Sequence, residues 1–195
     1  MDHEKTLTIL LASASPRRHQ ILQEHGLNVK AIPANIPEQI QPHETAAAYV
    51  VRLAYEKAHA VLAQEHSLDA DFILAADTVV AFEGQVLEKP ENAKEAYAML
   101  HRLSGQKHEV YTGYYLASLN AQQYDSGYVT TEIYFKPLSE TMIHEYIRTG
   151  DPFDKAGAYG IQNVRDTFIQ KISGSYYNVM GLPIEEITAK IRTRF

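Results

Sequence analysis

The stretch Phe72-Ile73-Leu74-Ala75-Ala76-Asp77-Thr78-Val79-Val80 contains the strongest indication of the fold. Its first five residues are all apolar, which is typical of a short strand buried on both faces of a sheet. Asp77 follows in hydrophobic surroundings, where a carboxylate costs free energy unless it is paired or bound to a cation. If the strand is 72–76, Asp77 lies beyond its carboxyl end, where open α/β sheets bind their ligands. The alternative is a structural role in which Asp77 caps nearby backbone.

A second buried strand, expected at residues 7–12, is followed directly by Ser13-Ala14-Ser15-Pro16-Arg17-Arg18. Ser15 suits the N-cap of a helix and Pro16 its first position, so we expect a helix from 16 to about 25. Arg17 and Arg18 then lie in the first turn, where the helix dipole disfavours cations. A strand end, a serine-rich turn and paired arginines at a helix N-terminus predict a phosphate site. The alternative is that the arginines face solvent or a neighbouring carboxylate.

Hydrophobic periodicity predicts further strands and helices along the rest of the chain. Strand 85–87 is expected to pair back in a hairpin, and two long antiparallel strands to be joined through 120–122. The expected strands are 29–33, 85–87, 108–119, 123–135 and 168–172. The expected helices are 45–64, 93–103 after an Asn92 cap, 140–148 after a Ser139 cap, and Pro183 to about Arg192. Irregular loops are expected at 34–44, 151–162 and 173–183.

Length and composition limit the class of protein. The 195 residues fit one domain, residues 1–195, with two lobes. A net charge of −6 argues against a nucleic-acid surface. The lack of cysteine excludes disulfides and thiolate zinc sites and is compatible with the cytoplasm, the expected compartment. No apolar run has the length of a membrane span, and the run 7–12 that follows the short charged segment 1–5 is too brief for the core of a signal peptide, so neither a membrane anchor nor a signal peptide is expected.

Several widespread site motifs are missing from the sequence. It contains no His-Glu-x-x-His metal motif and no Gly-x-x-x-x-Gly-Lys-Ser/Thr phosphate loop. It also contains no Gly-x-Gly-x-x-Gly dinucleotide motif and no Gly-x-Ser-x-Gly nucleophile elbow. The chain is therefore not predicted to be a P-loop NTPase, a Rossmann dehydrogenase or an α/β-hydrolase.

Four blocks, taken together and in order, resemble the Maf family of nucleoside triphosphate pyrophosphatases. They are Ser13-Ala14-Ser15-Pro16-Arg17-Arg18, Ala75-Ala76-Asp77-Thr78, Asp154-Lys155-Ala156-Gly157-Ala158-Tyr159-Gly160-Ile161-Gln162 and Tyr177-Asn178-Val179-Met180-Gly181-Leu182-Pro183. The resemblance covers residues 7–183. It implies an α/β fold similar to that of inosine-triphosphate pyrophosphatases, in which helices flank an elongated, twisted, mixed sheet and two lobes border a central cleft. It also implies a homodimer and a divalent cation, Mg²⁺ or Mn²⁺.

The same resemblance implies roles for individual residues. Asp77 matches the catalytic proton acceptor, and Glu38 is implied as a metal ligand, with Asp77 as a second candidate ligand. The residues implied in phosphate binding are Ser13, Arg18, Lys57, Lys89 and Lys155. Lys57 lies on the margin of the apolar stripe of helix 45–64, where a lysine is usually solvated. Arg17, Thr78 and Gln162 match the specificity residues of the subgroup that prefers dTTP and UTP, although Asn163 stands where many relatives have glycine.

The predicted function is hydrolysis of dTTP and UTP, and of modified pyrimidine nucleotides, to the monophosphate and pyrophosphate. The family also implies a house-cleaning role and a link to cell-division arrest. Two alternatives stay open at this point. One is a pyrophosphatase that prefers 7-methyl-GTP or another purine nucleotide. The other is a nucleotide-binding regulator of septum formation without turnover, for which a carboxylate near the phosphates brings no benefit because like charges repel.

Overall fold

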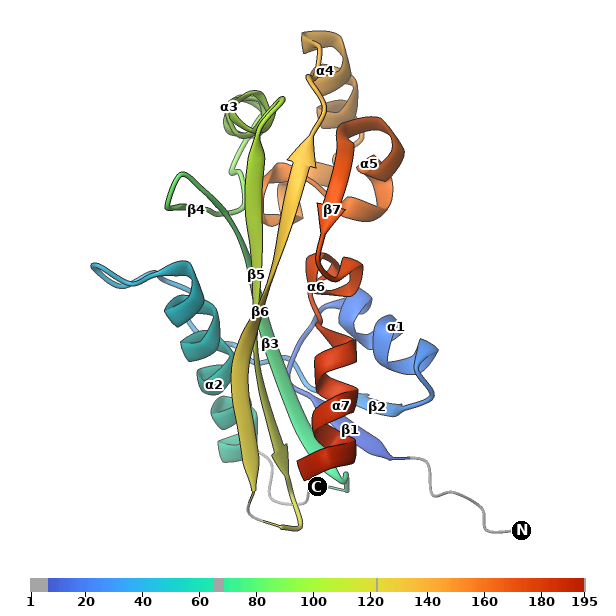
Figure 1. Ribbon diagram of the computed structural model, residues 1–195. Helices are drawn as coiled ribbons and strands as arrows, with labels where there is room; N and C mark the ends of the chain where they lie inside the picture. Colours follow the sequence, from blue (N-terminus) through green and yellow to red (C-terminus); the bar gives the residue numbers. More distant parts are fainter. Residues whose placement is uncertain (1–6, 65–68, 122, 195) are drawn as a thin grey trace. The chain divides into compact units, whose positions relative to one another are not determined.

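A computed structural model describes residues 7–64, 69–121 and 123–194 (Figure 1). The charged segment 1–5 and Gln122, expected in the turn between the two long strands, lie outside the described residues. The chain divides into two compact units. Unit 1 comprises Met1–Asp77, Thr112–Tyr128 and Gly181–Phe195, and unit 2 comprises Thr78–Tyr111 and Val129–Met180.

The described residues form one mixed sheet of seven strands, as the sequence predicts. The strands are β1 (Thr8–Leu11), β2 (Asn28–Ala31), β3 (Phe72–Phe82), β4 (Gln85–Leu87), β5 (Lys107–Ser118), β6 (Tyr124–Phe135) and β7 (Ile169–Ser173). Their order is β2-β1-β3-β5-β6-β7, and β4 pairs with β3 outside this path. β1 is parallel to β2 and β3, whereas β4 and β7 are antiparallel to β3 and β6 respectively.

Seven helices accompany the sheet in the described part of the chain (Figure 1). They are α1 (Pro16–Glu24), α2 (Ala46–Gln64), α3 (Ala93–Leu103), α4 (Glu140–Arg148), α5 (Ile161–Phe168), α6 (Tyr176–Met180) and α7 (Ile184–Arg194). The predicted caps of α3 and α4 are confirmed, because Asn92 accepts from the backbone N–H of Glu95 and Ser139 from that of Met142.

α6 lies within the loop expected at 173–183, and the prediction was wrong there. α5 overlaps the loop expected at 151–162 only at its first two residues, and Phe168, expected to begin a strand, instead ends α5. α5 carries Ile161, Val164 and Phe168 at helical spacing, and all three are buried. Two short 3-10 turns, Asp151–Asp154 and Ala156–Ala158, precede it. α6 has five residues. Helices this short derive their stability from packing rather than from propensity, so local patterns indicate them poorly.

In unit 1, α2 covers one face of the sheet, and α1 and α7 lie on the other face (Figure 1). Alternate strand residues point to opposite faces. Leu10, Ile73 and Ala75 accordingly pack with Ala54 and Ala58 of α2 in one fully or almost fully buried cluster. This alternation directs the next residue of the series, Asp77, toward the side of the sheet on which α2 lies.

The sequence predicts that this strand ends at Ala76, but β3 continues through Asp77 to Phe82. Its register with parallel β1 ends at Leu74, and its antiparallel register with β4 begins at Val80. The hairpin with β4 supplies pairing for Val80 to Phe82, and β5 also neighbours β3 in the sheet, so the strand stays extended. Asp77 nevertheless lies beyond the end of β1. The strand that follows β1 in the chain, β2, pairs on one side of β1, and the next strand, β3, pairs on the other side, so the strand order reverses here. Ligands of open α/β sheets bind at such a switch point.

Unit 2 is built around aromatic side chains. Phe135 of β6 contacts the rings of His108, Tyr159 and Phe168 edge to face, with centroids 4.8, 5.0 and 6.0 Å away. Such pairs add to the free energy of burial. Burial lowers the pKa of His108 to about 3, so its ring is neutral at neutral pH and accepts or donates a hydrogen bond with the Tyr159 hydroxyl at 2.8 Å.

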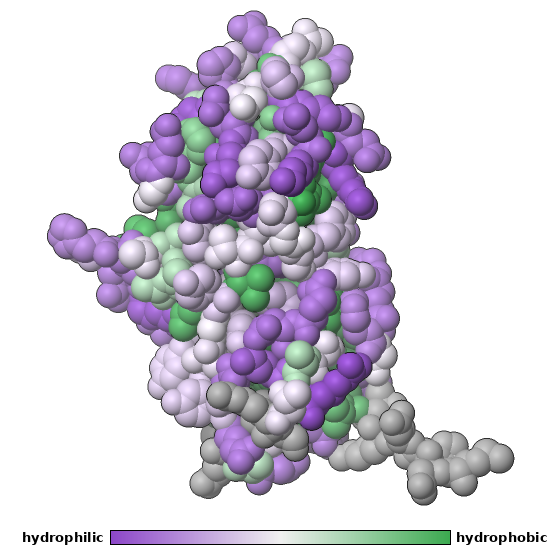
Figure 2. Space-filling view, in the orientation of Figure 1, coloured by the Kyte–Doolittle hydropathy of each residue, from purple (hydrophilic) through white to green (hydrophobic). Residues whose placement is uncertain are grey.

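Hydrophilic side chains predominate on the face of the molecule in Figure 2, and hydrophobic ones are scattered among them. This distribution is ordinary for a protein surface in water. Within the three described segments, no helix combines the length and the apolarity needed to cross a membrane.

Candidate active site

Three charged side chains from distant parts of unit 1 meet around the Lys57 ammonium group. Its Nζ lies 2.6 Å from Oδ1 of Asp77 and 2.6 Å from Oε1 of Glu38. Lys57 and Asp77 are each 6% exposed, whereas Glu38 is exposed. The expectation that Lys57 is solvated at the helix margin is therefore wrong. Because the buried carboxylate has a cationic partner, Asp77 meets the condition under which such a group is tolerated.

The elements of unit 1 explain how these groups come together. Lys57 lies on α2 between Ala54 and Ala58, whose side chains pack on the sheet. Asp77 points to the same side of β3 as Ala75. Glu38 comes from the irregular segment between β2 and α2, as expected. The ammonium group thus joins a buried strand carboxylate to an exposed loop carboxylate.

Ser13 and Arg18 form a second part of the site, immediately after β1. Arg18 donates from Nη1 to the Ser13 hydroxyl at 3.1 Å and from Nε to the Gly181 carbonyl at 2.7 Å. Burial lowers the pKa of Arg18 below its usual value; the charge of Asp77 opposes this effect, Arg17 adds to it and Glu38 opposes it. A guanidinium remains charged under such conditions. Gly181 belongs to one of the quoted blocks, but sequence reasoning did not identify its carbonyl as the acceptor that orients Arg18.

The turn before α1 differs from the expected cap. Ser15 occupies the N-cap position, but its side chain makes no capping hydrogen bond within the described residues. Instead the Ser13 hydroxyl accepts from the backbone N–H of Ser15 at 3.2 Å. A serine can close such a turn by bonding backbone two residues on. The predicted order of strand, serine turn and helix with Pro16 at its start is confirmed.

Lys155 is the centre of a corresponding charge cluster in unit 2. Its Nζ lies 2.8 Å from Oδ1 of Asp151 and 2.6 Å from Oδ1 of Asp154, and it donates to the Asp151 carbonyl at 2.8 Å. The side chain packs so closely on Gly160 that a β-carbon there would lie 2.6 Å from a lysine carbon. The sequence predicts only an irregular loop around Asp151, whereas in the structure its carboxylate organises that loop.

Gln162 lies in the first turn of α5 and is exposed. The neighbouring residues hold this turn through Asp151, which accepts from the Asn163 amide at 2.8 Å and from the Tyr146 hydroxyl. Tyr146 in turn accepts from the backbone N–H of Gly160 at 2.9 Å. Asn163, the departure from the family pattern, is thus a bonded member of the loop.

Thr78 and Lys89 are the remaining predicted site residues in unit 2. Thr78 is half-buried in β3, and Lys89 is exposed two residues after β4 ends. The backbone N–H of Gly157 donates to the Glu88 carbonyl at 3.2 Å, which ties the segment of Lys89 to the Lys155 loop. Gly157 has φ +67, and a β-carbon there would meet Val80 at 2.9 Å, so only glycine fits.

Glu38 and Asp77 are the predicted ligands of a divalent cation. Among the residues that the structure describes, no group of three or more His, Cys, Asp or Glu side chains is arranged to hold a metal. Asp77 and Glu38 nevertheless converge on one point, the Lys57 ammonium. Magnesium is commonly bound through one or two carboxylates together with substrate phosphates. The two carboxylates therefore fit a cation that arrives with a phosphorylated substrate.

Comparison with known proteins places this geometry in a family. Residues 8–194 match the model of the family described as Maf-like protein. The chain is 46% identical over 179 residues to the dTTP/UTP pyrophosphatases of Escherichia coli strain K12 and of Shigella boydii, covering 92% of this chain and 89% of each relative. It has the same identity and coverage with a nucleoside triphosphate pyrophosphatase of Shigella flexneri.

A solved structure resembles the chain in fold at low sequence identity. The Ham1 protein of Staphylococcus aureus aligns with a TM-score of 0.52 and 12% identity over 96% of this chain and 100% of that protein. This likeness agrees with the predicted α/β fold. The family model spans nearly the whole chain, and the chain belongs to the Maf-like protein family.

Proposed function

We propose that the protein is a nucleoside triphosphate pyrophosphatase that hydrolyses dTTP and UTP to the monophosphate and pyrophosphate. The observation that carries this proposal is the buried Asp77 carboxylate, held at the switch point of the sheet beside Lys57 and under the charge of Arg18. A protein that only binds nucleotides gains nothing from a carboxylate near phosphates, because like charges repel. A hydrolase gains a proton acceptor for the attacking water.

In the proposed reaction, water attacks phosphorus, the bond between the α- and β-phosphates breaks, and pyrophosphate leaves. Asp77 accepts the proton that the water loses. Phosphoryl chemistry depends mainly on positioning and charge neutralisation. Arg18, fixed by Ser13 and by the Gly181 carbonyl, is preorganised to bind a phosphate oxygen. Lys57 is positioned to exchange its contact with exposed Glu38 for a phosphate while it keeps Asp77.

Lys89 and Lys155 are the proposed phosphate ligands in unit 2. Lys89 is exposed. Lys155 is held by half-buried contacts to Asp151 and by Asp154, whose side chain is 72% exposed. Because an exposed ion pair is weak, a phosphate can displace Asp154 without disrupting the rest of the cluster.

We propose Mg²⁺ or Mn²⁺ as the cofactor, with Glu38 and Asp77 as its protein ligands. When bound, the cation neutralises phosphate charge and lowers the pKa of water. The convergence of these two carboxylates on one point supports the assignment.

Preference for pyrimidines is proposed to reside in Arg17, Thr78 and Gln162. An amide both donates and accepts, which suits the paired carbonyl and N–H edge of thymine or uracil. The names of the relatives, dTTP/UTP pyrophosphatase, support this substrate class.

The test is pyrophosphate release from a panel of dTTP, UTP, GTP, ITP and 7-methyl-GTP in the presence of Mg²⁺ or Mn²⁺. We expect dTTP and UTP to be cleaved faster than every purine nucleotide. Faster turnover of a purine nucleotide would favour the first alternative, a purine-preferring enzyme. Tight nucleotide binding without pyrophosphate release would favour the regulator of septum formation.

We also propose that the protein acts as a cytoplasmic homodimer, as the family resemblance implies. Light scattering during size-exclusion chromatography measures the mass in solution. A single peak at the monomer mass of 22.0 kDa at micromolar concentration would contradict the dimer.

A further inference from the structure

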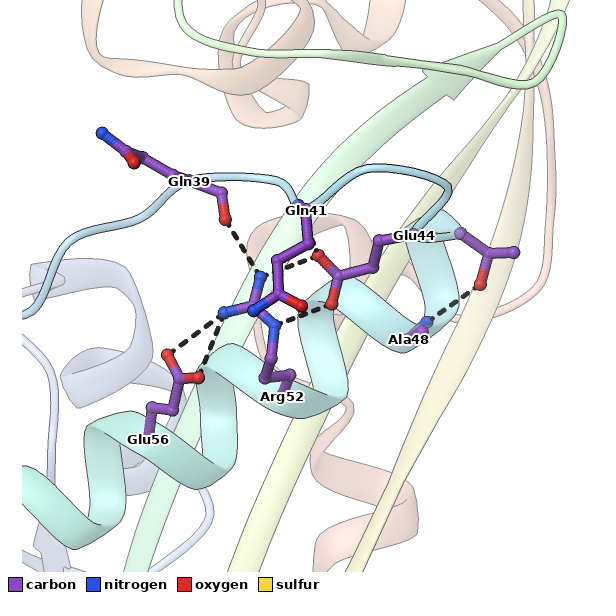
Figure 3. Close-up of polar contacts among 7 residues, drawn as sticks. Gln39, Gln41, Glu44, Ala48, Arg52 and Glu56 are labelled. Atoms are coloured by element: carbon purple, nitrogen blue, oxygen red, sulfur yellow. Dashed lines mark hydrogen bonds and ion pairs between the residues drawn. The ribbon is translucent and has the colours of Figure 1, made fainter.

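The guanidinium of Arg52, on α2, is bonded on all sides (Figure 3). Nε and Nη2 each donate to the Glu44 carboxylate at 2.7 Å, a two-pronged contact. Nη2 also donates to the Gln39 carbonyl at 3.0 Å, and Nη1 donates to Glu56 at 3.1 and 3.2 Å. Two of these partners belong to the irregular segment before α2, and the third belongs to α2 itself.

These contacts tie the segment 33–45 to α2. The segment has no regular secondary structure, so its own backbone provides little rigidity. Glu44 adds a further link, since its carboxylate accepts from the backbone N–H of Gln41 at 3.0 Å and its N–H donates to the Gln41 carbonyl at 3.1 Å. Arg52 thus holds Gln39 and Glu44, which lie before and after the turn at residues 42–43.

Glu38 is the residue directly before Gln39, and its carboxylate reaches Lys57 at 2.6 Å. Lys57 lies five residues after Arg52 on the same helix. The carbonyl held by Arg52 is therefore adjacent in the chain to the residue whose carboxylate joins the Asp77–Lys57 pair.

The charge state of Arg52 suits a permanent clamp. Hydrogen bonding to Glu44 raises the pKa of Arg52, and the same contact with Arg52 lowers the pKa of Glu44. Both groups are therefore ionised at neutral pH. Two carboxylates, Glu44 and Glu56, already neutralise the guanidinium, so it is poorly suited to bind phosphate.

We propose that Arg52 is a positioning residue that sets the affinity of the site for the divalent cation by fixing the backbone of Glu38. The proposal rests on the proposed function, in which Glu38 and Asp77 hold that cation. A residue that orients a metal ligand typically changes metal affinity by about 10- to 100-fold. Lysine cannot replace arginine here, because an ammonium group does not reproduce the planar fork.

Hydrogen exchange tests the clamp without any activity. We compare the wild-type protein with Arg52→Lys, which keeps the charge, and with the matched control Glu56→Gln, which removes only the negative charge of the partner on the helix. Arg52→Lys should speed exchange of the Gln41 and Glu44 amides by about tenfold, because one typical hydrogen bond contributes about that order in an opening equilibrium. Glu56→Gln should leave the exchange rates of both amides unchanged. Unchanged exchange in Arg52→Lys would overturn the proposal.

Metal titration tests the consequence for the site. Mn²⁺ binding followed by electron paramagnetic resonance, with a non-hydrolysable dTTP analogue present, should weaken about tenfold or more in Arg52→Lys. The Mg²⁺ concentration for half-maximal pyrophosphate release should rise in proportion, while the rate at saturating Mg²⁺ stays close to that of the wild type. A general structural defect would instead lower the saturated rate without moving the half-maximal concentration.

A double-mutant cycle shows whether Arg52 acts through Glu38. In a Glu38→Gln background, Arg52→Lys should have little further effect on Mn²⁺ binding, because the two residues act as a unit. Additive effects would overturn the proposal. If the wild-type protein releases no pyrophosphate, the proposed function fails, but hydrogen exchange and the Mn²⁺ measurements still decide the role of Arg52.

Discussion

Lys57 in unit 1 and Lys155 in unit 2 each contact two carboxylates at 2.6 to 2.8 Å, yet they reach them in different ways. One partner of Lys57 lies 20 residues later in the chain, and the other, Glu38, lies nearly as far before it. Those of Lys155 lie one and four residues earlier in the same loop. Lys57 and Asp77 are almost fully buried, whereas Asp154 is 72% exposed.

The difference indicates that the two clusters have different energetic roles. Breaking a buried pair leaves an uncompensated charge and costs about 3–5 kcal/mol, whereas exposed pairs contribute about 0–1 kcal/mol. A cluster like that of Lys57 exists only when the surrounding elements are packed. A cluster like that of Lys155 belongs to its loop and mainly determines the conformation of that loop.

The largest expected effect is on turnover, from Asp77→Asn. This change keeps the shape of the side chain but removes its charge and basicity, so turnover should fall by at least about 100-fold. The free energy of unfolding should fall by less than the 3–5 kcal/mol typical of a broken buried pair, because Glu38 still contacts Lys57. Pyrophosphate release, thermal melting and dTTP titration measure these changes.

Two controls distinguish the proposed role of Asp77 from other roles. Asp154→Asn, in the exposed pair of Lys155, should change turnover by no more than about threefold, as expected for a surface substitution. If excess Mg²⁺ largely restores the turnover of the Asp77→Asn variant, the main role of Asp77 is that of a metal ligand. Near-native turnover by a stable Asp77→Asn protein would contradict the proposed mechanism.

The second expected effect is on stability, from replacing each lysine by methionine. Lys57→Met leaves Asp77 as a buried, unpaired charge and should lower the free energy of unfolding by about 3–5 kcal/mol. Lys155→Met should lower it by only about 1 kcal/mol, because the carboxylates of its loop are more accessible to water. Urea denaturation followed by circular dichroism provides both values. Equal losses would remove the distinction between the two clusters.

A smaller effect is expected on substrate choice, from Asn163→Ala. The substitution removes one hydrogen bond to Asp151 and so loosens the turn that carries Gln162. One such bond contributes about 1 kcal/mol, so the ratio of kcat/KM for dTTP to that for GTP should fall about fivefold. Tyr146→Phe, which removes the hydroxyl bonded to Gly160, should act in the same direction. Unchanged selectivity in both variants would show that this turn does not position the base.

The smallest expected effect is a response of the Lys155 loop to acid. Burial opposes ionisation of Asp151, but hydrogen bonds from Lys155, Tyr146 and Asn163 outweigh it, so the pKa of Asp151 lies below its usual 3.8. A carboxyl with a lowered folded-state pKa stabilises the fold fully above its unfolded pKa, and this contribution disappears as the pH falls through the folded pKa.

Nuclear magnetic resonance of the Asn163 side-chain amide follows this response. The signal should stay constant from neutral pH to about pH 5 and change below about pH 4, where the carboxyl takes up its proton. The matched variant Asp151→Asn should lack that step. A transition near neutral pH would contradict the assignment to Asp151.

Much of the fold follows from local patterns in the sequence. The apolar runs before Ser13 and Asp77 predict β1 and the first half of β3, and both are confirmed. Ser139 and Asn92 mark the starts of α4 and α3, because capping depends on groups within three residues of one another. The hairpin at β4 likewise follows from a short turn next to apolar residues. Interactions of this range are fully represented in the local sequence.

What only the tertiary structure decided is which distant side chains meet. The pattern around Lys57 predicted a solvated lysine; its burial depends on α2 packing on β3 next to Asp77. The extension of β3 beyond Ala76 depends on pairing with neighbouring strands, β4 and β5 among them, and the helical form of residues 161–168 depends on burial of three side chains. The Arg52 clamp likewise joins residues that no periodicity connects. Periodicity reports the surroundings of a residue within a few positions, whereas the partner of a buried charge is chosen by how whole elements pack.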